Sequence, residues 1–174
     1  MMKYVPSTKI VVKAVVLTSL VVVSYFFGIQ LSRLVNMPDT NIGGMWCAIS
    51  AIVVFDDLRE NVKQLLKNRL LGTLIGSVIG VIWMYFVKDL MTSVCLSLVL
   101  VSILISLLKL DGALKIACTT VLIVSISTHG ASFSQIGITA TMRFIESVLG
   151  GLLSLGATVV MENSALFKAS KGDV

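Results

Sequence analysis

The sequence predicts an all-α integral membrane protein built as a bundle of six transmembrane helices. Of its 174 residues, 56% are hydrophobic and 13% are charged, whereas a soluble domain is about 45–50% apolar with about 25% charged residues. The apolar residues form long runs, which favour helices over the alternating segments of about ten residues found in membrane barrels. This composition excludes a soluble enzyme, a nucleic-acid-binding module and a secreted disulfide scaffold.

Six apolar runs approach the length of about 20 residues that a helix needs to cross a bilayer. Together they make residues 1–174 a single transmembrane domain. The first run is too long for the core of a signal peptide, about 7–15 residues, so we expect it to be retained. We place the six spans at about 10–34, 43–55, 70–87, 90–108, 113–128 and 142–161.

The most polar segment of the chain lies between the second and third spans, at about 57–69. Its apolar residues recur at helical spacing, which indicates an amphipathic helix that lies on the membrane surface or extends the third span. Asp57, followed by Glu60 three residues later, resembles a capping box.

The basic residues favour one orientation. With six spans and a cytoplasmic N-terminus, eleven of the fourteen Lys and Arg residues lie on the cytoplasmic side, and Arg33, Lys88 and Arg143 lie outside. The positive-inside rule therefore predicts that both termini are cytoplasmic.

Two stretches of the sequence match at an offset of 74 residues. Arg69–Gly76 and Arg143–Gly150 share Arg, Thr or Ser, and Gly in register. One stretch opens the third span and the other opens the sixth, so two halves of three spans would insert in opposite directions, as in transporters with inverted repeats. Coincidence, added to the common placement of Arg at span ends, is the alternative interpretation.

Small residues recur four apart in the same two spans. This spacing predicts faces where helices pack closely, within the bundle or between subunits of a homo-oligomer. The residues are Gly72, Gly76 and Gly80 in the third span, and Gly150, Ser154 and Thr158 in the sixth.

Three ionisable residues in these spans are candidates for a substrate path. Arg143 and Glu146 are three apart and can pair on one helix face. A charge at mid-membrane costs about 2.5–3.5 kcal/mol, so buried charges usually line a pathway; an interfacial pair is the alternative. Arg69 is expected at the N-terminus of the third span, where the helix dipole suits a carboxylate. It could equally be a positive-inside anchor.

Asp56, Asp57 and Trp46 are weaker candidates for the same path. The two carboxylates could couple protons if partly buried, or they could cap a helix. Trp46 could stack on an aromatic ring or anchor the span at the membrane interface. His129, the single histidine, is expected in a solvated loop.

The sequence offers no pattern for catalysis, a cofactor or a metal. Cys47, Cys95 and Cys118 are widely spaced and contain no Cys-x-x-Cys motif. We therefore expect no enzyme, no cofactor and no nucleic-acid partner.

The stretch Met45–Val54 (MWCAISAIVV), followed by a polar break and by Arg69–Gly76 (RLLGTLIG), resembles the fusaric acid resistance and aromatic acid exporter family. The Arg143–Gly150 stretch is similar to the sixth span of that family, and the resemblance covers about residues 9–162. The chain departs from the family at residues 55–57, where Phe-Asp-Asp stands in place of a frequent Gln-Pro.

The resemblance implies a multi-pass protein of the bacterial inner membrane that exports aromatic carboxylic acids and similar organic anions. Many members add a cytoplasmic domain that this chain lacks, so we expect the six-helix block to form a homo-oligomer. The alternatives are a non-transporting scaffold that anchors a separate soluble partner, and a small channel.

Overall fold

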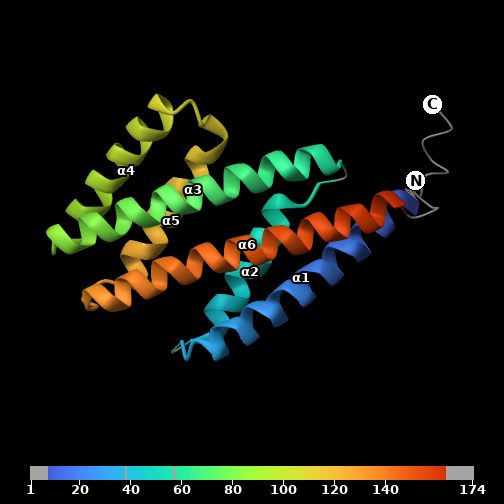
Figure 1. Cartoon of the computed structure of the whole chain (residues 1–174), viewed down its shortest axis with the longest axis horizontal. Helices are drawn as coiled ribbons and strands as arrows, with labels where there is room; N and C mark the ends of the chain where they lie inside the picture. Colours follow the sequence, from blue (N-terminus) through green and yellow to red (C-terminus); the bar gives the residue numbers. More distant parts are fainter. Residues whose placement is uncertain (1–7, 38, 57, 164–174) are drawn as a thin grey trace, which may run out of the picture. The chain divides into compact units, whose positions relative to one another are not determined.

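The computed structural model describes residues 8–37, 39–56 and 58–163, and their regular structure is entirely helical. Four of the described helices, α1, α3, α4 and α6, are long and apolar enough to cross a membrane. The elements in order are α1 Thr8–Leu34, α2 Thr40–Val54, α3 Arg59–Phe86, α4 Leu90–Leu107, the 3-10 turn η1 Asp111–Ala113, α5 Leu114–Ser127 and α6 Phe133–Asn163 (Figure 1).

The prediction of an all-α membrane bundle is confirmed. Two of the six helices are short, since α2 has 15 residues and α5 has 14. At a rise of about 1.5 Å per residue they measure about 21–22 Å, less than the hydrocarbon core of about 30 Å. The crossing of the membrane by α2 and α5 stays a prediction.

The chain divides into two compact units. The first contains residues 1–63 and 150–174, and the second contains residues 64–149. The first unit therefore holds α1, α2 and the C-terminal part of α6. The second holds most of α3, all of α4 and α5, and the N-terminal part of α6, with a core that includes Ile79, Val101, Ile105, Ala117 and Val121.

Helices α1 and α4 end with the same hydrogen-bonded cap. Asn36 and Lys109 each adopt a positive φ of 54° just after the helix. The next amide then donates to the carbonyl five residues back, which is the pattern of a Schellman motif. These bonds are Met37 N to Ser32 O and Leu110 N to Ile105 O, both 3.0 Å.

Helix α3 begins at Arg59 and continues without a break through the polar connector. The connector therefore extends the third span. Asp57, expected as the cap, lies outside the described residues. The carboxylate of Asp56 accepts from the Leu58 amide at 3.0 Å and from the Asn61 side chain at 3.1 Å, so it organises the start of the helix.

Helix α6 begins at Phe133, earlier than the apolar run from residue 142 indicates. The side chain of Gln135 accepts from the Ser132 amide at 3.0 Å and from the Ser132 hydroxyl at 3.1 Å. This is the reciprocal bond of a capping box, with Gln at the third position. The nine extra residues place Arg143 well inside the helix.

Several hydroxyl groups on the helices bond to their own backbone. Each donates to the carbonyl four residues earlier, at 2.5–2.9 Å, as Ser and Thr commonly do in membrane helices. They belong to Thr18, Ser102, Thr119, Thr120, Thr128 and Thr141.

Candidate functional site

An ion pair is buried in the second unit, on the N-terminal part of α6. Arg143 Nη1 lies 3.1 Å from Glu146 Oε2, and Nη2 donates to Oε1 at 3.2 Å. The Arg143 side chain is 6% exposed and that of Glu146 is fully buried. Arg143 follows the start of α6 by ten residues, about 15 Å along the axis. The pair therefore belongs to the helix interior and not to its outermost turn.

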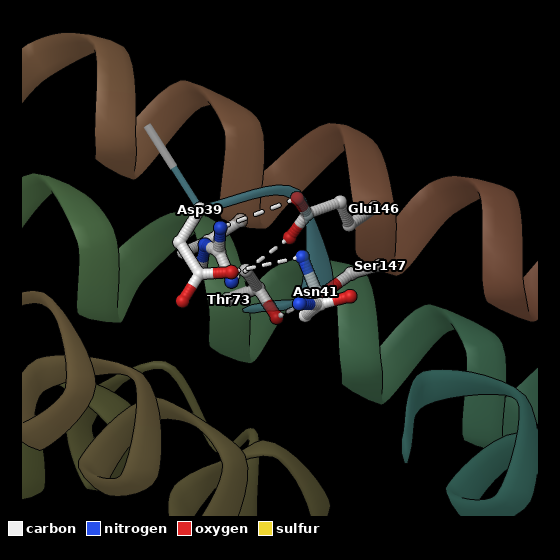
Figure 2. A network of polar contacts seen from close by, with 6 residues as sticks. Asp39, Asn41, Thr73, Glu146 and Ser147 are labelled. Carbon is white, nitrogen blue, oxygen red and sulfur yellow. Dashed lines mark hydrogen bonds and ion pairs between the residues drawn. The ribbon is translucent and has the colours of Figure 1, made fainter. Parts of the chain in front are cut away.

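A hydrogen bond joins α3 to the residue of α6 that follows Glu146. Thr73 on α3 donates to the Ser147 hydroxyl on α6 at 3.4 Å, and Figure 2 draws both residues together with Glu146. Thr73 is 2% exposed and Ser147 is 3% exposed. We refer to these four buried polar residues, Thr73, Arg143, Glu146 and Ser147, as the polar group.

Helix α3 carries a buried polar face that includes Thr73. Arg69, Thr73 and Ser77 are four residues apart, and each is at most 6% exposed. Because α3 begins at Arg59, Arg69 lies ten residues inside the helix and not at its N-terminus. The dipole effect falls off within the first turn, so it does not explain an anion site at Arg69.

The glycines of α3 face α5 in the same unit. A Cβ added to Gly76 would lie 2.5 Å from the Ala117 carbonyl oxygen, and one added to Gly72 would lie 2.7 Å from that of Ala113. The packing at Gly80 is looser, because a Cβ added there would lie 3.4 Å from Val124 Cγ1. The two backbones therefore approach closely because these positions have no side chain.

The small residues of α6 pack in the same way in the first unit. A Cβ on Gly150 would clash with the Cys47 carbonyl oxygen of α2 and lie 2.9 Å from Ser50 Cβ. Ser154 is fully buried, and the Thr158 hydroxyl donates to the Asp56 carbonyl at 2.9 Å.

These local arrangements repeat along the chain. Helix α6 begins 74 residues after α3, and the two arginines occupy the same position in their helices. Gly76 has Ala117 and Thr120 as neighbours, and Gly150 has Cys47 and Ser50. Cys47 precedes Ala117 by 70 residues, and Ser50 precedes Thr120 by the same number. The left-handed residues that cap α1 and α4 are 73 apart. Offsets of 70–74 residues, close to the one seen in the sequence, therefore recur in the contacts within each compact unit.

The sequence profile of proteins described as "Fusaric acid resistance protein-like" matches residues 19–157, about four fifths of the chain. The chain belongs to the fusaric acid resistance protein-like family. This membership and the apolar helices indicate a membrane protein of transporter type. No curated protein and no solved structure matches the chain.

In this member of the fusaric acid resistance protein-like family, the predicted site residues have different surroundings. Arg143 and Glu146 form an ion pair on α6, and the residue after Glu146, Ser147, bonds to Thr73 of α3. Asp56 shapes the start of α3, and Asp57 lies outside the described residues. Trp46 is half-buried on α2, in the first unit.

Sequence reasoning did not assign Thr73 and Ser147 to the site. The signal was nevertheless present, because Thr and Ser occupy the middle of the two stretches that match at the 74-residue offset. The contact between these two side chains is seen only in the structure.

A second polar region lies at the end of α3, near the turn that leads to α4. Lys88 and His129, with the edge-to-face rings of Tyr85 and Phe133, line a cavity of about 370 Å³. Hydrogen bonds from the Thr92 hydroxyl (2.6 Å) and amide (2.8 Å) hold the pKa of Asp89, which caps α4, below its usual range. The electrostatic interaction with His129 acts in the same direction.

Proposed function

We propose that this protein exports small organic anions, with aromatic carboxylates as the preferred class, across the bacterial inner membrane. The buried Arg143–Glu146 pair carries this proposal, together with the family membership. Ionisable side chains inside membrane helices are costly and usually mark a substrate or ion path. In the described helices the buried ionisable side chains are Arg69, Arg143 and Glu146.

The chemistry of the pair suits a carboxylate ligand. The planar fork of a guanidinium binds both oxygens of a carboxylate through parallel N–H···O bonds. Arg143 approaches both oxygens of Glu146, with one hydrogen bond of 3.2 Å from Nη2 and a second N···O distance of 3.1 Å from Nη1. The hydroxyls of Thr73 and Ser147 are further donors of the polar group.

An apolar groove in the second unit supports an aromatic substrate. Its volume is about 440 Å³, enough for a substituted benzene ring, and its walls come from α3 and from the N-terminal part of α6. The groove shares Ser77 with the polar face of α3. Its other lining residues include Leu74, Val78, Ile82, Ala140 and Phe144.

We extend the proposal to topology and assembly. Both termini face the cytoplasm, as the basic residues indicate. The chain works as a homo-oligomer, in which a second copy covers part of the large apolar side chains that the described helices leave exposed, such as Phe26, Tyr85 and Leu107.

The test is counterflow of radiolabelled benzoate into liposomes that contain the purified full chain. The wild-type protein should accumulate label when preloaded with unlabelled benzoate. The double variant Arg143→Gln/Glu146→Gln, which removes both charges together, should lose at least 90% of the rate. Lys115→Gln, a change at an exposed lysine, serves as the matched control and should leave the rate unchanged.

Folded wild-type protein that neither binds nor moves benzoate would contradict the proposal and favour the scaffold interpretation. Benzoate conductance without counterflow would contradict export and favour a channel.

A further inference from the structure

The two halves of the chain differ at one position of the polar group. The 74-residue offset pairs Arg69 with Arg143 and Thr73 with Ser147. It also pairs Gly72 with Glu146, so the carboxylate has no counterpart in the first half.

The contact between Thr73 and Ser147 places these positions at the centre of the repeat. In a two-fold arrangement, a residue touches its own counterpart only near the axis. Near this contact α3 and α6 run antiparallel, because Met84 and Ile136 also share a hydrophobic cluster. Each arginine precedes its hydroxyl by four residues, about 6 Å along its helix. The two arginines therefore lie on opposite sides of the axis.

The absence of a carboxylate from the first half follows from packing. A Cβ at Gly72 would lie 2.7 Å from the Ala113 carbonyl oxygen, which leaves no space for a side chain. The second half instead buries Glu146 completely. Apolar side chains usually fill such a space at no energetic loss relative to a buried ion pair. Packing alone therefore does not account for a carboxylate at this position.

We infer that Glu146 is a tethered substitute for the substrate carboxylate and thereby sets the affinity of the Arg143 site. This inference rests on the proposed function. Glu146 occupies the guanidinium of Arg143 before the substrate arrives and takes it back when the substrate leaves. Exchange of one carboxylate for another keeps the guanidinium paired throughout. Without Glu146, the substrate would bind more tightly and leave more slowly.

The experiment measures the dissociation constant of benzoate and the maximal counterflow rate for the full chain in lipid nanodiscs and liposomes. Glu146→Gln keeps the side-chain volume and removes the charge. It should lower the Kd about tenfold, the factor that corresponds to one charge-assisted hydrogen bond, and it should also lower the maximal rate.

Glu162→Gln is the matched control, because Glu162 lies on the same helix and accepts from the Arg59 amide at 3.0 Å. Its Kd should equal that of the wild type. A purely structural role for Glu146 predicts weaker benzoate binding in Glu146→Gln. An unchanged or raised Kd in monodisperse Glu146→Gln protein would overturn the inference.

A measurement on the wild-type protein keeps the inference testable if the variant does not fold. Infrared difference spectra with carboxyl-labelled benzoate separate the ligand band from protein carboxylate bands. Benzoate binding should shift a protein carboxylate band as Glu146 loses its partner. Binding without any such shift would overturn the role of Glu146 while leaving export intact. A wild-type protein that binds no benzoate would overturn the proposed function itself.

Discussion

The hydroxyl of Thr73 donates to the hydroxyl of Ser147 at 3.4 Å, although 74 residues separate the two in the chain. The same 74 residues separate the starts of α3 and α6, the two arginines, and the glycines that follow them. Counterparts in the repeat are thus in direct contact. A sequence match based on few positions becomes informative once it is joined to this contact.

Removal of Arg143 alone should strongly destabilise the protein, because Glu146 would remain buried without the guanidinium. Breaking a buried pair in this way costs about 3–5 kcal/mol. Arg143→Gln should therefore unfold at a clearly lower temperature in nanodiscs. The double variant Arg143→Gln/Glu146→Gln should recover most of the lost stability, since neither glutamine is charged. A double variant as unstable as the single one would show that the pair is not the cause.

Gly76→Ala should be destabilising, and the new methyl group is the physical reason. It would lie 2.5 Å from the Ala117 carbonyl oxygen and force α3 away from α5, at a cost of about 1–3 kcal/mol. Gly156→Ala on α6 is the matched control, because apart from its own stretch of helix backbone nothing lies within 4 Å of the new Cβ. It should be neutral or stabilising by up to about 1 kcal/mol. Equal melting temperatures of the two variants would exclude close packing at Gly76.

Asp89 should give the protein an acid-sensitive component of stability. Its pKa is lowered in the folded state by hydrogen bonds from Thr92, so its contribution is complete above the unfolded pKa and is lost as the pH falls through the folded pKa. The melting temperature should thus fall below about pH 4. Asp89→Ser retains a capping side chain without a titrating group. If the melting temperature of Asp89→Ser falls at low pH as much as that of the wild type, groups other than Asp89 cause the acid sensitivity.

The two ends of α3 should react on opposite sides of the membrane. Lys63 and Lys88 are exposed at the start and just past the end of this helix. In a background without native cysteines, an impermeant maleimide should label Lys88→Cys in intact cells. It should label Lys63→Cys only after permeabilisation. Labelling of both from outside would contradict both the crossing by α3 and the assigned orientation.

Much of the fold is predictable from apolar runs, but the helix ends depend on polar signals. The end of α1 at Leu34 and the start of α4 at Leu90 coincide with the predicted spans. Helix α6 starts earlier because Ser132 and Gln135 cap it, a signal that hydropathy does not register. Helix α3 starts earlier because the amphipathic connector simply continues into the span.

The ion pair of the candidate site is predictable from the sequence, but the contact between its two helices is not. The spacing of Arg143 and Glu146 on one helix face is enough to predict their pairing. The Thr73–Ser147 bond joins two helices, so no local rule yields it. Likewise, the dipole argument for Arg69 fails because the position of a residue within a helix depends on where the helix begins.

Hydroxyl groups that bond to their own helix backbone lower the free-energy cost of inserting that helix into a membrane. Thr119 and Thr120 on α5 donate to the carbonyls of Lys115 and Ile116, so neither hydroxyl requires a hydrogen-bond acceptor outside its own helix. Hydropathy scales count such residues with free hydroxyls and therefore overstate the partitioning cost of α5. The predicted crossing of the membrane by α5 therefore costs less at these two threonines than their composition indicates.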